Sequence, residues 1–205
     1  MTRQDVRIVL ASASPRRLDL LRRIGLAPEV APADVDERLL PGEAPDAAAG
    51  RLAGLKADAA CRLLEPGPAL VIAADTIVAI DGRSLGKPAD AAEAAAMLER
   101  LSGRTHEVHT GFVVAGAAGA AAGRRVASVV TTRVRVKRLS RAEIDGYVAT
   151  GEPFGKAGAY AIQGAGAFMV TAVEGSVTNV IGLPLAEVLE ALVALGGPGA
   201  FGSRG

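Results

Sequence analysis

Two oppositely charged side chains, Asp75 and Lys87, stand on the two limbs of a hairpin that the sequence predicts near the middle of the chain. The apolar run 69–74 is typical of a strand buried on both faces, and Asp75 comes where this strand is expected to end. Asp81-Gly82 then favours a two-residue type I′ turn. An acid at the C-terminal end of a strand beside a lysine suits a site for a metal and a phosphate. A capped strand end with a surface lysine is the alternative interpretation.

A second anion site is predicted near the N-terminus, where the strand expected over 7–11 leads into a helix. Ser14 suits the N-cap of that helix. The free N–H groups and the positive dipole end of a helix N-terminus favour a phosphate. Ser12 adds a second hydroxyl there, and Arg16 and Arg17 add guanidinium donors. These residues therefore indicate phosphate binding, with a capped helix and two solvated arginines as the alternative.

Three carboxylates and a lysine are further candidate ligands for a metal and a phosphate. Asp34, Asp36 and Glu37 lie in an extended acidic segment, where neighbouring carboxylates could bind a divalent cation or simply form a solvated loop. The helix predicted over 45–64 carries Lys56 beside its apolar stripe, so this ammonium either reaches outward to water or enters a cleft. The stripe is predicted to consist of Leu52, Leu55, Ala59 and Leu63.

The glycine-rich segment 151–166 is a candidate ligand-binding loop. Its glycines permit a close approach of the backbone to a ligand, and Lys156 and Gln163 are its polar side chains. Because the amide of a glutamine both donates and accepts hydrogen bonds, Gln163 could read the edge of a nucleobase. An ordinary structural loop explains the same residues equally well.

The elements that must position these side chains alternate between strands and helices. His106 and His109 lie three residues apart on a predicted strand, so they face opposite ways and we expect no shared metal site. Two helices begin with a capping box, at Asp90 and at Ser140. The further predicted elements are strands over 104–115, 124–138 and 168–173, helices over 90–101 and 140–150, and a terminal helix over 185–195.

Length and composition narrow the class of protein. A chain of 205 residues, half of them apolar, forms one domain or two small lobes that share a cleft. The formal charge of +1, the scarcity of aromatic residues and the lack of a basic stripe argue against a nucleic-acid or membrane partner. The single cysteine, Cys61, is expected to be a buried or half-buried thiol. Because no apolar run reaches about 18 residues and no signal-peptide core is present, we expect a soluble cytoplasmic protein.

Taken together, these segments resemble the Maf family of nucleoside triphosphate pyrophosphatases over nearly the whole chain. Each match is weak alone, but their joint order is specific. The resemblance implies an α/β fold with a mixed, twisted central sheet flanked by helices and a cleft between two lobes. It implies one domain over 1–195, followed by a flexible tail over 196–205. The matching stretches, in order, are 10–17, 36–37, 55–57, 74–78 with 85–88, 97–98 with 101–103, 156–160 with 162–164, and 182–184.

The resemblance also assigns chemical roles. It implies hydrolysis between the α- and β-phosphates, releasing a nucleoside monophosphate and pyrophosphate, with Asp75 as the proton acceptor for the attacking water. Glu37 and Asp75 would hold a divalent cation, Mg²⁺ or Mn²⁺. The residues that would bind the triphosphate are Ser12, Arg16, Lys56 and Lys87, and those that match the branch acting on dTTP and UTP are Arg16, Thr76 and Gln163. A homodimer is left open.

Two departures and several alternatives accompany this interpretation. Gly155 stands where many relatives carry an acid, and Ala161 replaces a frequent glycine. Neither touches the proposed catalytic set, but both could alter the mobility of the base-reading loop. The alternatives are a nucleotide-binding regulator of cell division and a pyrophosphatase with another base preference, such as 7-methyl-GTP or modified pyrimidine triphosphates. The cellular task would be clearing noncanonical nucleotides or control of division.

Overall fold

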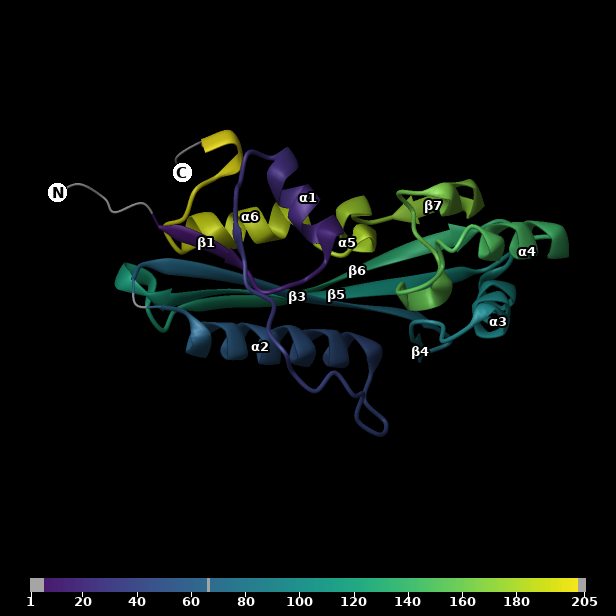
Figure 1. The fold of residues 1–205 in the computed structure, drawn as a ribbon, viewed down its shortest axis with the longest axis horizontal. Coiled ribbons are helices and arrows are strands. Elements are labelled where there is room, and N and C mark those ends of the chain that lie inside the picture. Colours follow the sequence, from purple (N-terminus) through teal and green to yellow (C-terminus); the bar gives the residue numbers. More distant parts are fainter. Residues whose placement is uncertain (1–5, 66, 203–205) are drawn as a thin grey trace.

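The computed structural model describes residues 6–65 and 67–202, and a single mixed β-sheet organises this part of the chain (Figure 1). The strand order is β2-β1-β3-β5-β6-β7, with β4 paired to β3. Neighbours among β2, β1 and β3 are parallel, and all other pairs are antiparallel. The strands are β1 Arg7–Leu10, β2 Glu29–Val30, β3 Ala69–Ile80, β4 Arg83–Leu85, β5 Thr105–Ala118, β6 Arg125–Val136 and β7 Val170–Glu174. The predicted α/β class with a mixed central sheet is confirmed.

Helices cover both faces of this sheet. The α-helices are α1 Pro15–Arg23, α2 Pro45–Leu63, α3 Ala91–Leu101, α4 Arg141–Ala149, α5 Val177–Ile181 and α6 Leu185–Ala194. Helix α2 packs on one face, whereas α1 and α6 pack on the other, and α3 and α4 lie together at the far end of the long axis (Figure 1). The short helix α5 had not been predicted. None of the helices among the described residues is both long and apolar enough to cross a membrane.

Side chains along β3 alternate between the two faces of the sheet and pack in two different apolar clusters. Leu70, Ile72 and Ala74 pack in the cluster with α1 and α6, whereas Ala69, Val71 and Ala73 pack in the cluster with α2. Because successive side chains of a strand point to opposite faces, Asp75 continues the α2 side and Thr76 continues the α1 side. The alternation of side chains along the strand therefore places these two adjacent residues on opposite faces of the sheet.

Asp75 does not lie at the end of a strand, as the sequence had predicted, but in the middle of β3. This strand pairs with β5 from Ala69 to Ala79. On the other edge of β3, the pairing with β1 ends at Ile72, and the pairing with β4 begins at Val78. Between these positions no strand among the described residues lies beside that edge. The gap opens the sheet next to Asp75 and Thr76, so an edge left uncovered, rather than a strand end, exposes the acid.

The predicted apolar stripe of α2 is wrong in two of its four positions. Leu55 and Leu63 are exposed, and the buried face consists largely of alanines. The reason is a very close approach of α2 to β5: a Cβ atom at Gly111 would lie 2.2 Å from the carbonyl oxygen of Ala49. Large side chains cannot enter such an interface, because protein interiors are close-packed. Leu55 and Leu63 therefore lie outward, and mostly small residues form the contact.

The turn and cap patterns predicted local structure well. Asp81 and Gly82 both have positive φ, 53° and 69°, as a type I′ turn between β3 and β4 requires. The capping box at Ser140 is complete. Asp90 caps α3 through the N–H of Glu93. Strand β7 begins two residues later than predicted because a short 3₁₀ helix, Ala165–Met169, precedes it.

The chain continues past α6 with specific contacts. The N–H of Phe201 donates to the carbonyl oxygen of Ile24 at 2.7 Å, and the N–H of Gly197 donates to Leu192 at 2.8 Å. These bonds join residues 197–201 to α6 and to the C-cap residue of α1. The last part of the predicted tail, 203–205, lies outside the described residues, so a flexible tail stays a prediction there.

Candidate active site

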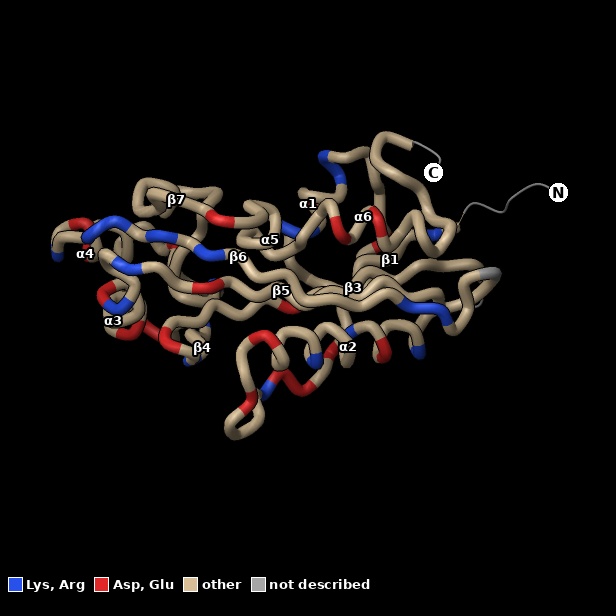
Figure 2. The backbone as a smooth tube through the Cα atoms, turned by 180° about the vertical axis from the view of Figure 1, so that it is seen from behind, with Lys and Arg blue, Asp and Glu red and all other residues tan. Residues whose placement is uncertain are grey.

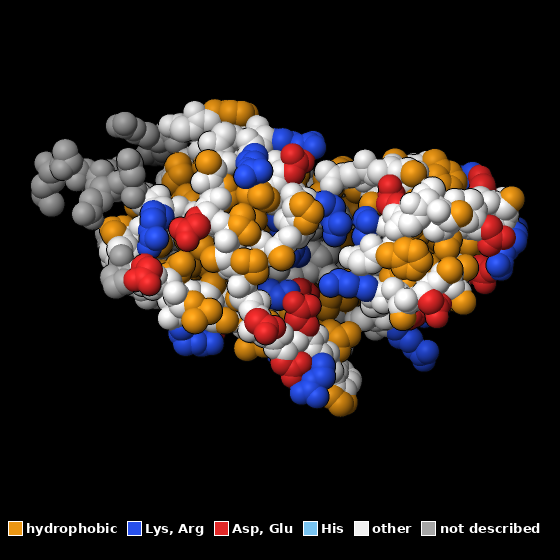
Figure 3. All heavy atoms as spheres, in the orientation of Figure 1, with side chains coloured by type: hydrophobic (Ala, Val, Ile, Leu, Met, Phe, Trp, Pro, Cys, Tyr) orange, Lys and Arg blue, Asp and Glu red, His pale blue; other side chains and the backbone are white. Residues whose placement is uncertain are grey.

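A cavity of about 400 Å³ opens where the sheet edge is uncovered. It lies between α1 and α2 on one side and the segment 155–163 on the other, which confirms the predicted cleft. Lys and Arg side chains gather around this hollow in the middle of the molecule (Figure 3), whereas basic and acidic positions are otherwise spread along most elements (Figure 2). The charged residues that line the cavity are Arg16, Arg17, Lys56, Lys87 and Lys156, with the carboxylates Glu37 and Asp75. Every residue to which the family resemblance gives a role lines it.

Lys56 joins the two carboxylates of the cavity. Its Nζ donates to Asp75 Oδ1 at 2.6 Å and contacts Glu37 Oε1 at 2.8 Å. The side chains of Lys56 and Asp75 are 10% and 13% exposed, whereas that of Glu37 is 50% exposed. The hydrogen bond from Lys56 lowers the pKa of Glu37. Of the two interpretations of Lys56, the ammonium in a cleft is therefore confirmed.

The acidic segment contributes one of its three carboxylates to the cavity. Glu37 lines it, whereas Asp36 turns to its own neighbour and is held by the guanidinium of Arg38 at 2.6 to 2.9 Å. Those hydrogen bonds lower the pKa of Asp36 to about 2. Asp34 is exposed and does not line the cavity. For Asp34 and Asp36 the solvated-loop interpretation is therefore the one that the structure supports.

Arg17 is not a solvated arginine but a buried residue whose hydrogen bonds join three segments. Its Nε donates to the carbonyl oxygen of Gly182 at 2.7 Å, Nη1 donates to Ser12 Oγ at 2.9 Å, and Nη2 donates to Thr76 Oγ1 at 3.1 Å. Burial lowers the pKa of this guanidinium, and Asp75 partly opposes that effect. The helical spacing could have predicted its burial, because Arg17 shares the inner face of α1 with Leu20 and Leu21.

Ser12 has its hydroxyl oriented by this arrangement. Oγ accepts from Arg17 and from the backbone N–H of Ser14 at 3.2 Å. Ser14 is the N-cap of α1 as predicted, but its side chain makes no cap hydrogen bond. A serine hydroxyl has two acceptor lone pairs and one proton to donate. Since both lone pairs of Ser12 are used within the protein, its proton is left for an acceptor in the cavity.

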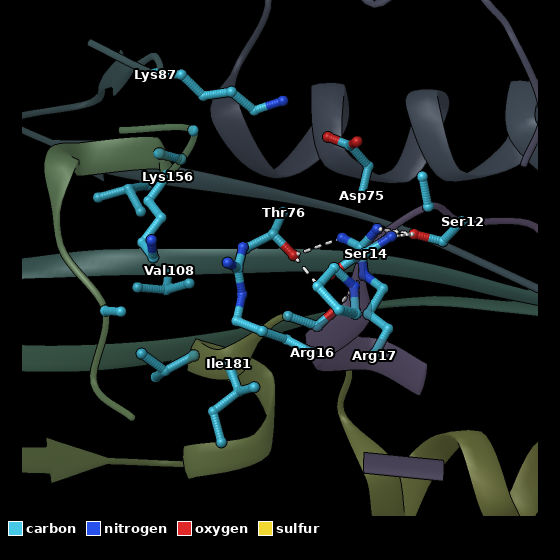
Figure 4. Close-up of a pocket in the computed structure, with 18 of the residues that line it drawn as sticks. Ser12, Ser14, Arg16, Arg17, Asp75, Thr76, Lys87, Val108, Lys156 and Ile181 are labelled. Carbon is cyan, nitrogen blue, oxygen red and sulfur yellow. Dashed lines mark hydrogen bonds between the residues drawn. The ribbon is translucent and has the colours of Figure 1, made fainter. Parts of the chain in front are cut away.

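Three cations that line the cavity come from separate parts of the chain (Figure 4). The ammonium group of Lys87 points toward the side of the cavity that holds Asp75, and the ends of Arg16 and Lys156 face one another. Burial, followed by repulsion from Arg16, lowers the pKa of Lys156. An anion that binds between these like charges offsets the repulsion between them. The arrangement therefore favours a polyanionic ligand.

The segment 155–163 forms the opposite wall. Gln163 is exposed and lines the cavity, and Thr76 faces inward, with Oγ1 within hydrogen-bond distance of Thr110 Oγ1 at 3.0 Å. The glycine expectation needs a correction at Gly158. A Cβ atom there would lie 2.8 Å from Val78 Cγ1, and φ is +70°, so this glycine serves packing and turn geometry rather than the approach of a ligand. Gly155 also has positive φ, +73°.

Asn179 is a residue that the sequence analysis missed. It is fully buried on α5, and its Nδ2 donates to the carbonyl oxygen of Val108 and to Thr132 Oγ1, both at 2.9 Å. Thr110 Oγ1 donates to the carbonyl oxygen of Asn179 at 3.0 Å. These bonds fix α5 to the sheet and thereby place the carbonyl of Gly182 beside Arg17. The cap of Ser176, whose Oγ accepts from the N–H of Asn179, was the available signal.

The two histidines have different partners, in keeping with the opposite orientations predicted for them. His106 Nε2 and the hydroxyl of Tyr160 are 2.8 Å apart, whereas His109 Nδ1 lies 2.9 Å from Thr131 Oγ1. Among the described residues, no group of three or more His, Cys, Asp or Glu side chains forms a metal cluster. Mg²⁺ is commonly held by one or two carboxylates together with the phosphates of a substrate. Glu37 and Asp75, both bonded to Lys56, fit that smaller requirement.

Relatives of known name match nearly the whole of this chain. A relative from Syntrophotalea carbinolica named dTTP/UTP pyrophosphatase is 52% identical over 97% of this chain and 89% of its own. Relatives of the same name from Anaeromyxobacter dehalogenans and Myxococcus xanthus are 54% and 50% identical, covering 94% and 97% of this chain and 95% and 97% of their own.

Solved structures add little to these matches. A nucleoside-triphosphatase / dITP/XTP pyrophosphatase from Mycobacterium abscessus is 18% identical, with a TM-score of 0.39 over 65% of this chain and 76% of its own. Its likeness carries no argument here. The profile of the family described as Maf-like protein, in contrast, matches residues 7–195. The chain therefore belongs to the Maf family.

Proposed function

We propose that this protein hydrolyses nucleoside triphosphates to the monophosphate and pyrophosphate, with dTTP and UTP as its preferred substrates. The observation that carries the proposal is Lys56, whose ammonium joins Asp75 and Glu37 at the bottom of a cavity rimmed by cations. The names of the relatives at about 50% identity support the choice of substrates. A cavity of about 400 Å³ is large enough for a small-molecule ligand.

The side chains divide the chemical work. Attack on a triphosphate first requires neutralisation of its charge, and we assign this to Arg16, Lys56 and Lys87, with the hydroxyl proton of Ser12 as a further donor. Asp75 then orients a water molecule for attack. The tasks that we give to Asp75 are to hold this water in line and to accept the proton that it loses. Pyrophosphate leaves with the negative charge that the cations stabilise.

A divalent cation, Mg²⁺ or Mn²⁺, is part of the proposal. Glu37 and Asp75 would hold it together with phosphate oxygens of the substrate. When bound, such an ion neutralises charge on the phosphates and polarises the reacting group. Lys56 would then share the carboxylates with the ion, since its Nζ already contacts both of them.

Base selection is assigned to the opposite wall. The amide of Gln163 can pair with the edge of a pyrimidine, because it offers a donor and an acceptor side by side. Arg16 lies between the phosphate side and this wall, where it faces Lys156 (Figure 4). Thr76 contributes to the same boundary. A cytoplasmic location, a homodimeric state and the domain limits 1–195 remain predictions.

A substrate panel tests the proposal directly. Purified protein with Mg²⁺ or Mn²⁺ is offered each common nucleoside triphosphate, together with 7-methyl-GTP and 5-methylated pyrimidine triphosphates. Pyrophosphate and monophosphate are expected to appear in equal amounts, fastest with dTTP and UTP. Release of inorganic phosphate instead would contradict cleavage between the α- and β-phosphates. Tight nucleotide binding without any turnover would contradict the enzyme and favour a nucleotide-binding regulator.

A further inference from the structure

The carboxylate of Glu152 is an unusually well-bonded group outside the catalytic set. Its Oε1 accepts from the hydroxyl of Tyr147 at 2.8 Å and from the N–H of Gly166 at 2.9 Å. Its Oε2 accepts from the N–H of Ala165, also at 2.9 Å. The hydroxyl of Tyr147 in turn accepts from the N–H of Ala161 at 3.2 Å. One carboxylate and one phenol therefore hold three backbone N–H groups.

These three N–H groups lie on both sides of Gln163. Ala161 comes two residues before it, and Ala165 and Gly166 come two and three residues after it. Residues 160–164 belong to no helix or strand, so regular backbone pairing does not fix this stretch. Backbone groups buried without partners are costly, and here two side chains from the end of α4 and the residues after it provide those partners. The position of Gln163 at the cavity thus depends on Glu152 and Tyr147.

The carboxylate of Glu152 and the phenol of Tyr147 occupy space next to two glycines. A Cβ atom at Gly164 would lie 2.0 Å from Glu152 Oε2, and one at Gly166 would lie 2.7 Å from the hydroxyl oxygen of Tyr147. The two glycines therefore leave the room that the carboxylate and the phenol occupy. Burial raises the pKa of Glu152, but the hydrogen bonds from Gly166, Tyr147 and Ala165 outweigh it, so the net pKa is lowered. The group is an anion at neutral pH.

Glu152 also reaches the second polar side chain of the same wall. The Nζ of Lys156 donates to its carbonyl oxygen at 2.5 Å. Lys156 lines the cavity opposite Arg16 (Figure 4). The side chain of Glu152 thus fixes Gln163, while its backbone fixes Lys156.

We infer that Glu152 and Tyr147 are positioning residues that hold Gln163 in register with the base and so set the selectivity between nucleotides. The inference rests on the proposed function, because it takes Gln163 to contact a pyrimidine. Neither residue touches the phosphate side of the cavity, since the cavity lining includes neither Glu152 nor Tyr147. Their loss should therefore change recognition of the base much more than the chemical step.

Two variants test the inference. Glu152→Gln places an NH₂ group against a backbone or phenolic donor, and Tyr147→Phe removes the acceptor for Ala161. Either change should raise KM for UTP about tenfold, the loss expected when one ligand hydrogen bond is no longer held in place, with kcat changed less than about threefold. The preference for UTP over ATP should fall by a similar factor. The matched control is Glu174→Gln, an exposed glutamate paired with Arg133, which should change neither quantity.

A double-mutant cycle with Gln163→Ala shows whether Glu152 acts by positioning Gln163 or by a general effect on the structure. If Glu152 acts through Gln163, Glu152→Gln should leave the selectivity of Gln163→Ala unchanged. An equal fall of selectivity in both backgrounds would overturn the inference, as would unchanged KM values in both single variants.

Hydrogen exchange provides a readout that does not depend on catalysis. The amides of 161–167 should exchange faster in Glu152→Gln than in the wild type, whereas those of β3 should not. If the wild type releases no pyrophosphate from any nucleotide, the proposed function fails, and exchange alone still decides whether the pair holds the loop. Unchanged exchange would overturn the positioning role. Should Glu152→Gln not fold, Tyr147→Phe gives the same two measurements.

Discussion

The two walls of the cavity are built in different ways. The wall that carries Asp75, Lys56 and Ser12 consists of residues on β3, on α2 and just before α1. Arg17 joins Ser12 to Thr76 on β3, and Lys56 joins α2 to Asp75 on β3. The wall that carries Gln163 lies between short 3₁₀ turns, and the side chains of Glu152 and Tyr147 hold it. Regular elements thus fix one wall, and a few side-chain bonds fix the other.

This difference suits the division of labour in the proposed function. The triphosphate is common to all nucleotides, and its cleavage needs groups held with little tolerance. The base differs between substrates, and a wall held by a few bonds can change its contacts without disturbing the sheet. Changes on the first wall should therefore reduce turnover of every nucleotide alike, whereas changes on the second should alter the order of preference.

The largest effect is expected from Asp75→Asn on the first wall. The amide keeps the shape of the side chain but cannot accept a proton or hold water as a carboxylate does. Turnover should fall by about 10²- to 10⁴-fold for every substrate. Equilibrium binding of UTP, measured by titration calorimetry, should change little because Lys56 keeps Glu37 as a partner. Substantial residual turnover would contradict the role of Asp75, and a loss confined to one nucleotide would contradict the comparison of the walls.

Arg17→Lys is expected to have the next largest effect. A lysine cannot reach Gly182, Ser12 and Thr76 at once with the geometry of a guanidinium fork. The free energy of unfolding should fall by about 3 kcal/mol, because buried acceptors lose a charged donor. Denaturant titration measures that loss, and kcat/KM should fall for all nucleotides together. Arg23→Lys, on the exposed end of the same helix, is the control and should be neutral.

Gly158→Ala tests the second wall. The added methyl group would meet Val78 Cγ1 at 2.8 Å, at a residue with φ of +70°. We expect a loss of about 2 kcal/mol in the free energy of unfolding, from strain and contact together. Gly151→Ala separates the two causes, since φ there is +76° but nothing lies within 4 Å of the added atom. A loss of about 1 kcal/mol is expected for this control from strain alone. Equal losses in both variants would show that contact with Val78 is unimportant.

How far the sequence predicts the two walls also differs. On the first wall, the apolar run of β3 and the Asp81-Gly82 turn at its end follow from local chemistry, and the structure has them. Position along the strand was the error, because the gap between β1 and β4 depends on where two other strands end. No local pattern around Asp75 contains that information.

On the second wall, the sequence identified Gln163 and Lys156 but not what holds them. Glu152 and Tyr147 act through backbone N–H groups more than ten residues away, so no spacing rule connects them. The inward face of α2 was missed for a similar reason. Its alanines are buried because Gly111 on a distant strand permits close contact, whereas the leucine pattern also placed Leu55 and Leu63 on this face, and both are exposed.

The smallest effect is expected where the sheet contacts the second wall, between His106 on β5 and Tyr160. Burial lowers the pKa of His106 to about 4, from an ordinary value of 6.5. Below pH 6.5 the unfolded chain therefore binds a proton at His106 that the folded protein does not bind. The free energy of unfolding falls as the pH falls toward 4. Between pH 7 and 5.5 this loss should be about 1 kcal/mol. His106→Gln removes the titrating group, so denaturant titrations should show a shallower fall in that variant over the same range. Parallel curves for wild type and variant would show that His106 takes up its proton equally in the folded and the unfolded protein.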